Sequence, residues 1–183
     1  MNFYGSKDLA RAFRTVRANT VKIAEEIPED KYDFAAAPGT RTVRQMLTHI
    51  ALADSFATFH REKRTSFDGV NFPELVATMQ AEEAKPRSKA EVIALLKQRG
   101  EEMASWVSSL DDGILGEAFR QPAGTDPAAK SRFEMIQGIK EHEMHHRGQL
   151  MLLQRMVGVT PHLTREREAR ERAQAPAAAQ ANR

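Results

Sequence analysis

Four stretches of this chain repeat their apolar residues every three or four positions, and this spacing constrains the fold more than any other feature. An α-helix makes one turn in about 3.6 residues, so such a repeat gathers apolar side chains on one face. The stretches span residues 7–26, 42–63, 88–110 and 131–157. No segment shows the apolar–polar alternation of a half-buried strand. The sequence therefore predicts one all-α domain, a four-helix bundle.

Local signals indicate where these helices begin and end. A hydroxyl residue followed three positions later by Glu or Gln forms a capping box, which is typical of a helix N-terminus. Three of the four stretches begin in this way: Thr42 with Gln45, Ser88 with Glu91, and Ser131 with Glu134. Proline cannot continue a helix, and glycine commonly terminates one. We therefore expect Pro28 to end the first helix and Gly158 to end the fourth.

The connections between the helices differ in length. Residues 64–87, between the second and third helices, are long enough to cross along the bundle and are expected to contain a short helix at 73–83. A Gly- and Pro-containing segment, residues 111–130, precedes the fourth helix. We assign the bundle to residues 1–163, followed by a charged, alanine-rich tail at 164–183 that is expected to be solvated or disordered.

The composition excludes several classes of function. The chain has 183 residues and no cysteine, so it suits one domain and offers neither a disulfide framework nor a thiolate metal ligand. No apolar run approaches the roughly 20 residues of a membrane span, and the first ten residues lack the layout of a signal peptide. Acidic and basic residues are interleaved around a net charge of +2. We expect a cytoplasmic protein with neither a membrane nor a nucleic-acid partner.

Two histidines interrupt the apolar face of the fourth helix. From Ile139 the three-and-four spacing continues to His142 and His146, which are four residues apart and therefore share one helix face. A buried imidazole needs a polar partner, and one divalent metal ion would satisfy both rings. Zinc, nickel and iron are the metals that imidazole commonly binds. The alternative is a pair of core histidines that bind neighbouring side chains or water.

A third ligand for such a metal is expected from the second helix. His49 lies on its apolar side, and bundle metal sites draw ligands from facing helices. His60 lies three turns away and is expected at the surface or at a helix end. His145 points away from the pair or serves behind it, and His162 is expected in a loop. Three histidines leave at least one coordination position open, as in a catalytic metal site.

Residues 142–146 also spell H-E-x-x-H, the signature of zinc proteases, in which the glutamate is the general base. The longer form of that signature requires glycine where this chain has Gln149. A downstream carboxylate ligand would have to be Glu166 or Glu168, and both lie in the charged tail. The protease interpretation is therefore disfavoured. Glu143 remains a candidate catalytic base, with a solvated surface position as the alternative.

The runs from Thr42 to Ile50 (TVRQMLTHI) and from His142 to Gly158 (HEMHHRGQLMLLQRMVG) together resemble the DinB/YfiT-like superfamily over residues 9–161. The resemblance implies an up-down-down-up bundle, frequent homodimers, and a divalent metal, often nickel or zinc, at positions matching His49, His142 and His146. Characterised members include thiol S-transferases that use low-molecular-weight thiols, and others are described as metal-dependent hydrolases. Relatives commonly carry tryptophan where this chain has Arg41.

The expected function is a metal centre that activates water or a low-molecular-weight thiol for reaction with a small-molecule substrate. The alternative is a non-catalytic metal-binding protein or a dimeric interaction module. Two further residues of the run from His142 to Gly158 are expected to have structural roles. Gly148 inside a helix costs about 1 kcal/mol relative to alanine, which indicates a close helix crossing. Gln149 can bond a ligand histidine or nearby backbone.

Overall fold

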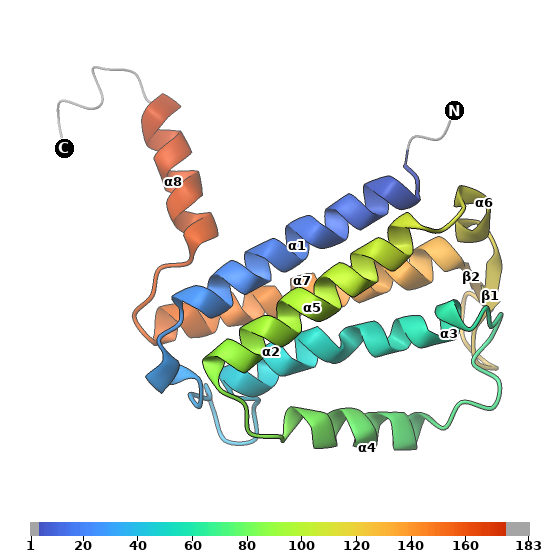
Figure 1. Ribbon diagram of the computed structural model, residues 1–183, viewed down its shortest axis with the longest axis horizontal. Coiled ribbons are helices and arrows are strands. Elements are labelled where there is room, and N and C mark those ends of the chain that lie inside the picture. Colours follow the sequence, from blue (N-terminus) through green and yellow to red (C-terminus); the bar gives the residue numbers. More distant parts are fainter. Residues whose placement is uncertain (1–3, 175–183) are drawn as a thin grey trace.

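The computed structural model describes residues 4–174, which are mostly helical. Four long segments, α1, α2 with its continuation into α3, α5 and α7, lie alongside one another, and α4 lies along α2 (Figure 1). The α-helices are α1 Ser6–Glu26, α2 Val43–Leu52, α3 Thr58–Arg61, α4 Phe72–Glu83, α5 Lys89–Ser108, α6 Asp112–Leu115, α7 Arg132–Met156 and α8 His162–Gln174. The other elements are the 3-10 turns Glu29–Lys31 and Ala53–Ala57, and the strands β1 Ala118–Arg120 and β2 Ala129–Ser131.

The predicted helix starts are confirmed, because each depends on local chemistry. The side chains of Thr42, Ser88 and Ser131 accept a hydrogen bond from the backbone N–H three residues ahead, and each capping box closes in return. The short helix expected at 73–83 is α4. After α7, Gly158 adopts a φ of 83°, a left-handed conformation that glycine reaches at little cost and that terminates the helix.

The prediction of one continuous helix over 42–63 is wrong. A 3-10 turn at Ala53–Ala57 separates α2 from α3. The turn buries the side chain of Asp54, which lies 3.0 Å from Arg99 on α5 and 3.8 Å from Arg61 on α3. A buried carboxylate needs such partners, and apolar spacing along one segment carries no information about them.

A short hairpin, also absent from the prediction, precedes α7. Strands β1 and β2 pair antiparallel, with Ala118 opposite Ser131 and Arg120 opposite Ala129. Phe119 at the centre of β1 is fully buried and packs edge-on against His60 and Phe67. Strands of three residues are too short to show an alternating pattern, so pairing and this aromatic contact define them.

Two apolar clusters fill the bundle, and a buried ion pair lies between them. Along α1, Arg17 falls between Phe13 of one cluster and Val21 of the other. Its guanidinium binds the carboxylate of Glu143 on α7, with Nε 2.9 Å from Oε1. The same guanidinium donates to the backbone carbonyls of Leu96 on α5 and Ile50 on α2, at 2.7 and 3.4 Å. One side chain of α1 thus contacts the other three long segments.

Helix α8 follows the bundle and leaves it at an angle (Figure 1). It therefore makes part of the expected tail helical, and residues 175–183 of that tail lie outside the described residues. Arg165 of α8 contacts Glu26 of α1 at 2.6 Å. Within residues 4–174, no helix combines the length and the apolarity that a membrane crossing requires.

Candidate metal centre

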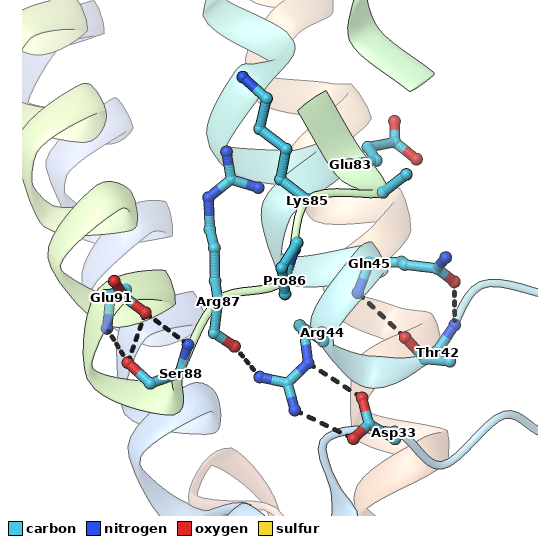
Figure 2. A pocket seen from close by; sticks show the side chains of 11 residues that line it. Asp33, Thr42, Arg44, Gln45, Glu83, Lys85, Pro86, Arg87, Ser88 and Glu91 are labelled. Carbon is cyan, nitrogen blue, oxygen red and sulfur yellow. Dashed lines mark hydrogen bonds and ion pairs between the residues drawn. The ribbon is translucent and has the colours of Figure 1, made fainter. Parts of the chain in front are cut away.

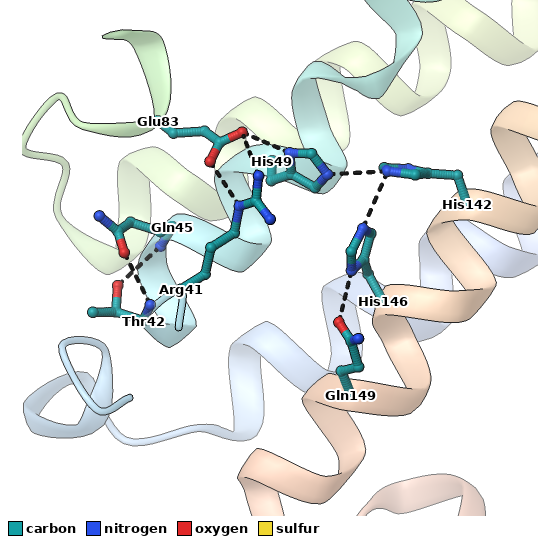
Figure 3. A network of polar contacts seen from close by, with 8 residues as sticks. All are labelled: Arg41, Thr42, Gln45, His49, Glu83, His142, His146 and Gln149. Atoms are coloured by element: carbon teal, nitrogen blue, oxygen red, sulfur yellow. Dashed lines mark hydrogen bonds and ion pairs between the residues drawn. The ribbon is translucent and has the colours of Figure 1, made fainter. Parts of the chain in front are cut away.

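The structure brings together the three histidines that the sequence selected as metal ligands. His49 comes from α2, and His142 and His146 come from successive turns of α7 (Figure 3). The Nε2 atom of His142 lies 3.0 Å from Nε2 of His49 and 3.1 Å from Nε2 of His146. One nitrogen from each ring lies within 4.8 Å of the others. Three ring nitrogens from two helices therefore converge on one point.

The outer nitrogens of two rings have partners that determine their tautomers. Nδ1 of His49 lies 2.6 Å from Oε1 of Glu83, and Nδ1 of His146 lies 2.7 Å from Oε1 of Gln149. Both partners are acceptors, so each Nδ1 carries a proton, and in the neutral ring the Nε2 lone pair is then turned toward His142. His142 can donate its single Nε2 proton to only one of them. With the His142 proton on Nδ1 instead, a cation at the centre would bind the Nε2 lone pairs of all three rings, as in metal sites whose histidines are held from behind.

The distances and protonation states also fit a metal ion. Nitrogens about 2.05 Å from a tetrahedral zinc ion lie about 3.3 Å from one another, which is close to the 3.0 and 3.1 Å between His142 and the other two rings, and all three atoms lie within 4.8 Å of one another. Burial, together with the neighbouring rings of His146 and His49, lowers the pKa of His142 to about 4. Burial also lowers the pKa of His146. Both rings are therefore neutral near pH 7, which is the form that binds metals.

Glu83, at the C-terminal end of α4, is the site residue that the sequence did not reveal. Its buried carboxylate binds His49 through Oε1 and lies 2.8 Å from Nε of Arg41 through Oε2. Burial acts to raise the pKa of Glu83, but the hydrogen bonds from Arg41 and His49 hold it below its ordinary value. The carboxylate is therefore ionised. Arg41, which stands where relatives commonly carry tryptophan, reaches the site through this carboxylate (Figure 3).

Glu143, the candidate catalytic base, is located differently from either expectation. The side chain is buried, so the solvated surface position is wrong. Both carboxylate oxygens accept hydrogen bonds from Arg17, and the cluster of convergent ligands contains histidines only. The ion pair accounts for this glutamate as a link between α1 and α7, so the geometry does not support a role as base.

The remaining residues of the matching run are at the periphery. His145 is exposed, and its Nε2 lies 3.2 Å from Nε2 of Gln149. The expected contact between Gln149 and a ligand histidine is confirmed by its bond to His146. Gly148 is exposed, and a Cβ atom built on it would meet no atom within 4 Å. The expectation of a close helix crossing at Gly148 is therefore wrong within the described part of the chain.

Two other histidines are buried, contrary to expectation. His60 does lie at a helix end, but only 6% of it is exposed, and its Nδ1 lies 3.2 Å from Nη1 of Arg132. His162 is the first residue of α8 rather than a loop residue, and its Nε2 lies 3.2 Å from the side chain of Asn19. Both partners are distant in the sequence, so helical spacing alone could not reveal them.

A polar cavity of about 520 Å³ lies at the junction of α4 and α5, beyond Glu83 (Figure 2). Its basic side chains are already paired. Arg44 binds Asp33 and the backbone carbonyl of Arg87, and Arg87 binds Glu82. None of the three clustered histidines lines it. These contacts connect the end of α4, the segment just before α5 and the start of α2, and they explain the cavity as a structural junction.

Comparison with known proteins places these features in context. The family model of the DinB superfamily matches residues 12–150. None of the curated proteins matches the chain. Several solved structures share the fold at low sequence identity. A DinB-like protein of Bacillus subtilis, YjoA, is 21% identical with a TM-score of 0.60, and the match covers 83% of this chain and 93% of that one.

Two further structures of similar size give comparable matches. YfiT from Bacillus subtilis, described as a probable metal-dependent hydrolase with an unusual four-helix bundle topology, is 18% identical with a TM-score of 0.63. That match covers 85% of this chain and 89% of YfiT. A DinB-like protein from Bacillus cereus is 16% identical with a TM-score of 0.65, and the match covers 87% of this chain and 97% of that one. At these identities the matches establish a shared fold.

Proposed function

The chain belongs to the DinB superfamily. On that basis we propose that it is a metal-dependent enzyme that acts on small-molecule substrates. His49, His142 and His146 would hold one divalent ion, with zinc or nickel as the best candidates and iron as a third. The observation that carries the proposal is the convergence of three Nε2 atoms whose rings are neutral or held by acceptors from behind.

The reaction type follows from what the residues offer. A divalent ion supplies Lewis acidity at the position that three ligands leave open. The chain has no cysteine, so a thiol nucleophile would have to come from a low-molecular-weight co-substrate. Hydrolysis and thiol S-transfer both remain consistent with the site. YfiT, the probable metal-dependent hydrolase, supports the first, and the resemblance to thiol S-transferases supports the second.

The protein's own residues would orient the ligands rather than supply a base. Glu83 and Gln149 hold His49 and His146 with their lone pairs turned inward. Glu83 is engaged by both His49 and Arg41, and Glu143 is engaged by Arg17. This engagement of both carboxylates favours the second candidate function, a non-catalytic metal-binding or interaction module.

Metal analysis tests the centre directly. Protein purified without an affinity tag should contain about one divalent ion per chain, and His49→Ala and His146→Ala should each lose it. His145→Ala is the matched control, because His145 is exposed and lies outside the cluster. Unchanged metal stoichiometry in both ligand variants would overturn the proposal. Turnover of a panel of esters and of thiols with electrophiles, with and without chelator, then separates enzyme from module.

We also propose the up-down-down-up helix order that the resemblance implies. Figure 1 supports it, because α4 returns the chain from the end of α3 toward the end where α2 begins, and α5 starts there. The cytoplasmic location and the absence of nucleic-acid partners stay predictions.

The exposed face of α7 supports the proposal of a homodimer. Met144, Leu152 and Met156 are 43, 58 and 49% exposed and follow four- and eight-residue spacing along the helix. Gly148 continues the same row and would allow a second copy to approach closely. Light scattering should show a dimer that Leu152→Asp dissociates, whereas Val76→Asp on α4, also at an exposed apolar residue, should leave it intact. A monomeric wild-type protein would contradict the assignment.

A further inference from the structure

A second cavity, of about 250 Å³, lies beside the metal centre and is lined mainly by apolar side chains. His142 contributes to both the cavity and the histidine cluster, so the cavity adjoins the candidate metal position. The apolar part of its lining includes Phe56, Phe67, Met135 and Ile139. His60 also lines the cavity. A cavity of about 150 Å³ admits benzene, so this one has room for a benzene-sized ring with a substituent.

His60 borders the cavity at a distance from the metal centre. Its partner Arg132 and the ligand His142 are ten residues apart on α7, which corresponds to about 15 Å along the helix. Met135, Gly138 and Ile139 occupy the intervening turns and line the cavity. The cavity therefore extends along α7, with a metal ligand toward one end and His60 toward the other.

The contacts of His60 determine which group it offers to the cavity. The guanidinium of Arg132 can only donate, so Nδ1 of His60 accepts the 3.2 Å hydrogen bond and the ring proton is on Nε2. Burial and the adjacent Arg132 lower the pKa of His60 to about 4, so the ring is neutral near pH 7. Among the described residues, Nε2 of His60 has no hydrogen-bond partner. His60 therefore offers one N–H donor without a partner within residues 4–174, and apart from His142 the other residues that line the cavity are apolar.

We propose that this cavity is the substrate pocket of the metal centre, and that it takes an apolar group of about the size of a substituted phenyl ring bearing a hydrogen-bond acceptor. His60 would recognise the acceptor, such as a carbonyl oxygen, through its Nε2–H. A substrate lacking the acceptor leaves this N–H without a partner in the pocket, so His60 would act as a specificity-determining residue. The inference rests on the proposed function, because the metal gives the pocket its reaction.

Filling the cavity tests the pocket. A Cβ atom built on Gly138 meets no atom within 4 Å, and this residue lines the cavity, so Gly138→Leu should place the rest of its side chain in that space. Gly138→Ala is the matched control, since it changes the same helix position and leaves most of the space open. Acetophenone serves as the probe, with binding measured by ligand-observed NMR. We expect the wild-type and Gly138→Ala proteins to bind it and Gly138→Leu to weaken binding at least tenfold.

The role of His60 is tested with a matched pair of ligands. α-Methylstyrene has nearly the shape of acetophenone but carries CH₂ in place of the carbonyl oxygen. The wild-type protein should prefer acetophenone about fivefold, as one net hydrogen bond implies. His60→Phe should abolish the preference. His60→Gln retains both an acceptor for Arg132 and a donor for the pocket, so it should restore the preference. Equal preference in all three proteins would overturn the role of His60.

The content of zinc, nickel and iron measured on the same samples separates this inference from the proposed function. If the protein holds one of these metals but Gly138→Leu binds acetophenone as well as Gly138→Ala does, the pocket assignment is overturned and the metal centre stands. If Gly138→Leu loses acetophenone while no variant or wild-type sample holds any of the three metals, the pocket stands and the metal-dependent function fails. Thermal unfolding shows whether His60→Phe is folded. If it is not, the comparison of Gly138→Leu with Gly138→Ala still tests whether acetophenone binds in the cavity.

Discussion

Oε1 of Glu83 lies 2.6 Å from Nδ1 of His49, although the two residues are 34 positions apart in the sequence. The contact joins the end of α4 to the last turn of α2. It turns the connection between two bundle helices into part of the candidate metal centre. A histidine held in this way keeps one tautomer and one ring orientation, and its metal-binding nitrogen becomes more basic.

Removal of this carboxylate should weaken metal binding. Glu83→Ala is expected to lower zinc affinity about 10- to 100-fold, because His49 loses the acceptor that orients it. Glu83→Gln keeps a hydrogen-bond acceptor but loses the charge, so its zinc affinity should lie between those of the wild type and Glu83→Ala. Competition with a chromophoric chelator measures the affinities. The neighbouring Glu82 pairs with Lys85 and Arg87 instead, so Glu82→Ala is the control, and an equal loss in both alanine variants would contradict the prediction.

Metal removal should destabilise the folded chain. An ion that binds only the native state stabilises it by about 2.7 kcal/mol when its free concentration is 100 times the dissociation constant. Chelation should therefore lower the midpoint of thermal unfolding, and added zinc should restore it. His146→Ala should unfold at the same temperature with zinc and with chelator. A zinc-dependent shift that persists in this variant would indicate binding elsewhere.

Two glycines inside long helices should respond oppositely to alanine. A Cβ atom at Gly100 on α5 would lie 2.5 Å from Cγ of Arg17, so Gly100→Ala must displace the arginine that holds the central ion pair. Overpacking of this kind costs about 1–3 kcal/mol. Gly138→Ala on α7 meets open space and should gain up to about 1 kcal/mol from helix propensity. Urea unfolding measures both changes, and stabilisation by both variants would show that Arg17 adjusts freely.

The buried His60 should make stability depend on pH. Its pKa is about 4 in the native state and about 6.5 in the unfolded chain. Between these values only the unfolded state takes up the proton, so the free energy of unfolding falls as the pH is lowered from 6.5 to 4. The slope from this residue approaches about 1.4 kcal/mol per pH unit. Above pH 6.5 the ring is neutral in both states and contributes no slope.

His60→Gln isolates this contribution, because the carboxylates that titrate in the same range are common to both proteins. The difference in stability between wild type and variant should change between pH 6.5 and 4 and become constant below pH 4. Chemical unfolding at several pH values, performed on metal-free protein, supplies the measurement. A difference that stays constant from pH 7 to pH 4 would show that His60 is not protected from protonation.

The sequence predicts most of the helical framework because its determinants are local. The caps at Thr42, Ser88 and Ser131 and the terminating Gly158 act within one turn of their own helices. The three metal-ligand candidates could be selected because two share a helix face and the third occupies an apolar face of another helix. Bringing His49 next to His142 required only that those two apolar faces pack together.

What the sequence did not reveal depends on contacts between distant residues. The 3-10 turn at Ala53–Ala57 accompanies the pairing of Asp54 with Arg99, 45 residues further along. The burial of Glu143 follows from its pairing with Arg17, 126 residues away. Glu83 looks like any acidic residue of a short helix until α4 is placed against α2. Charged residues carry no periodic signal for burial, so their partners emerge only from the folded chain.

The position of Arg17 has a consequence for any attempt to divide this protein. Its guanidinium is bound by groups on α2, α5 and α7, so each of the four long segments is needed to complete its shell. A cut anywhere between α3 and α5 leaves Arg17 on one fragment and Glu143 on the other. Each fragment alone would then have to fold around an unpaired charge, which costs several kcal/mol. Neither piece should fold by itself, and the two should regain structure only on being mixed.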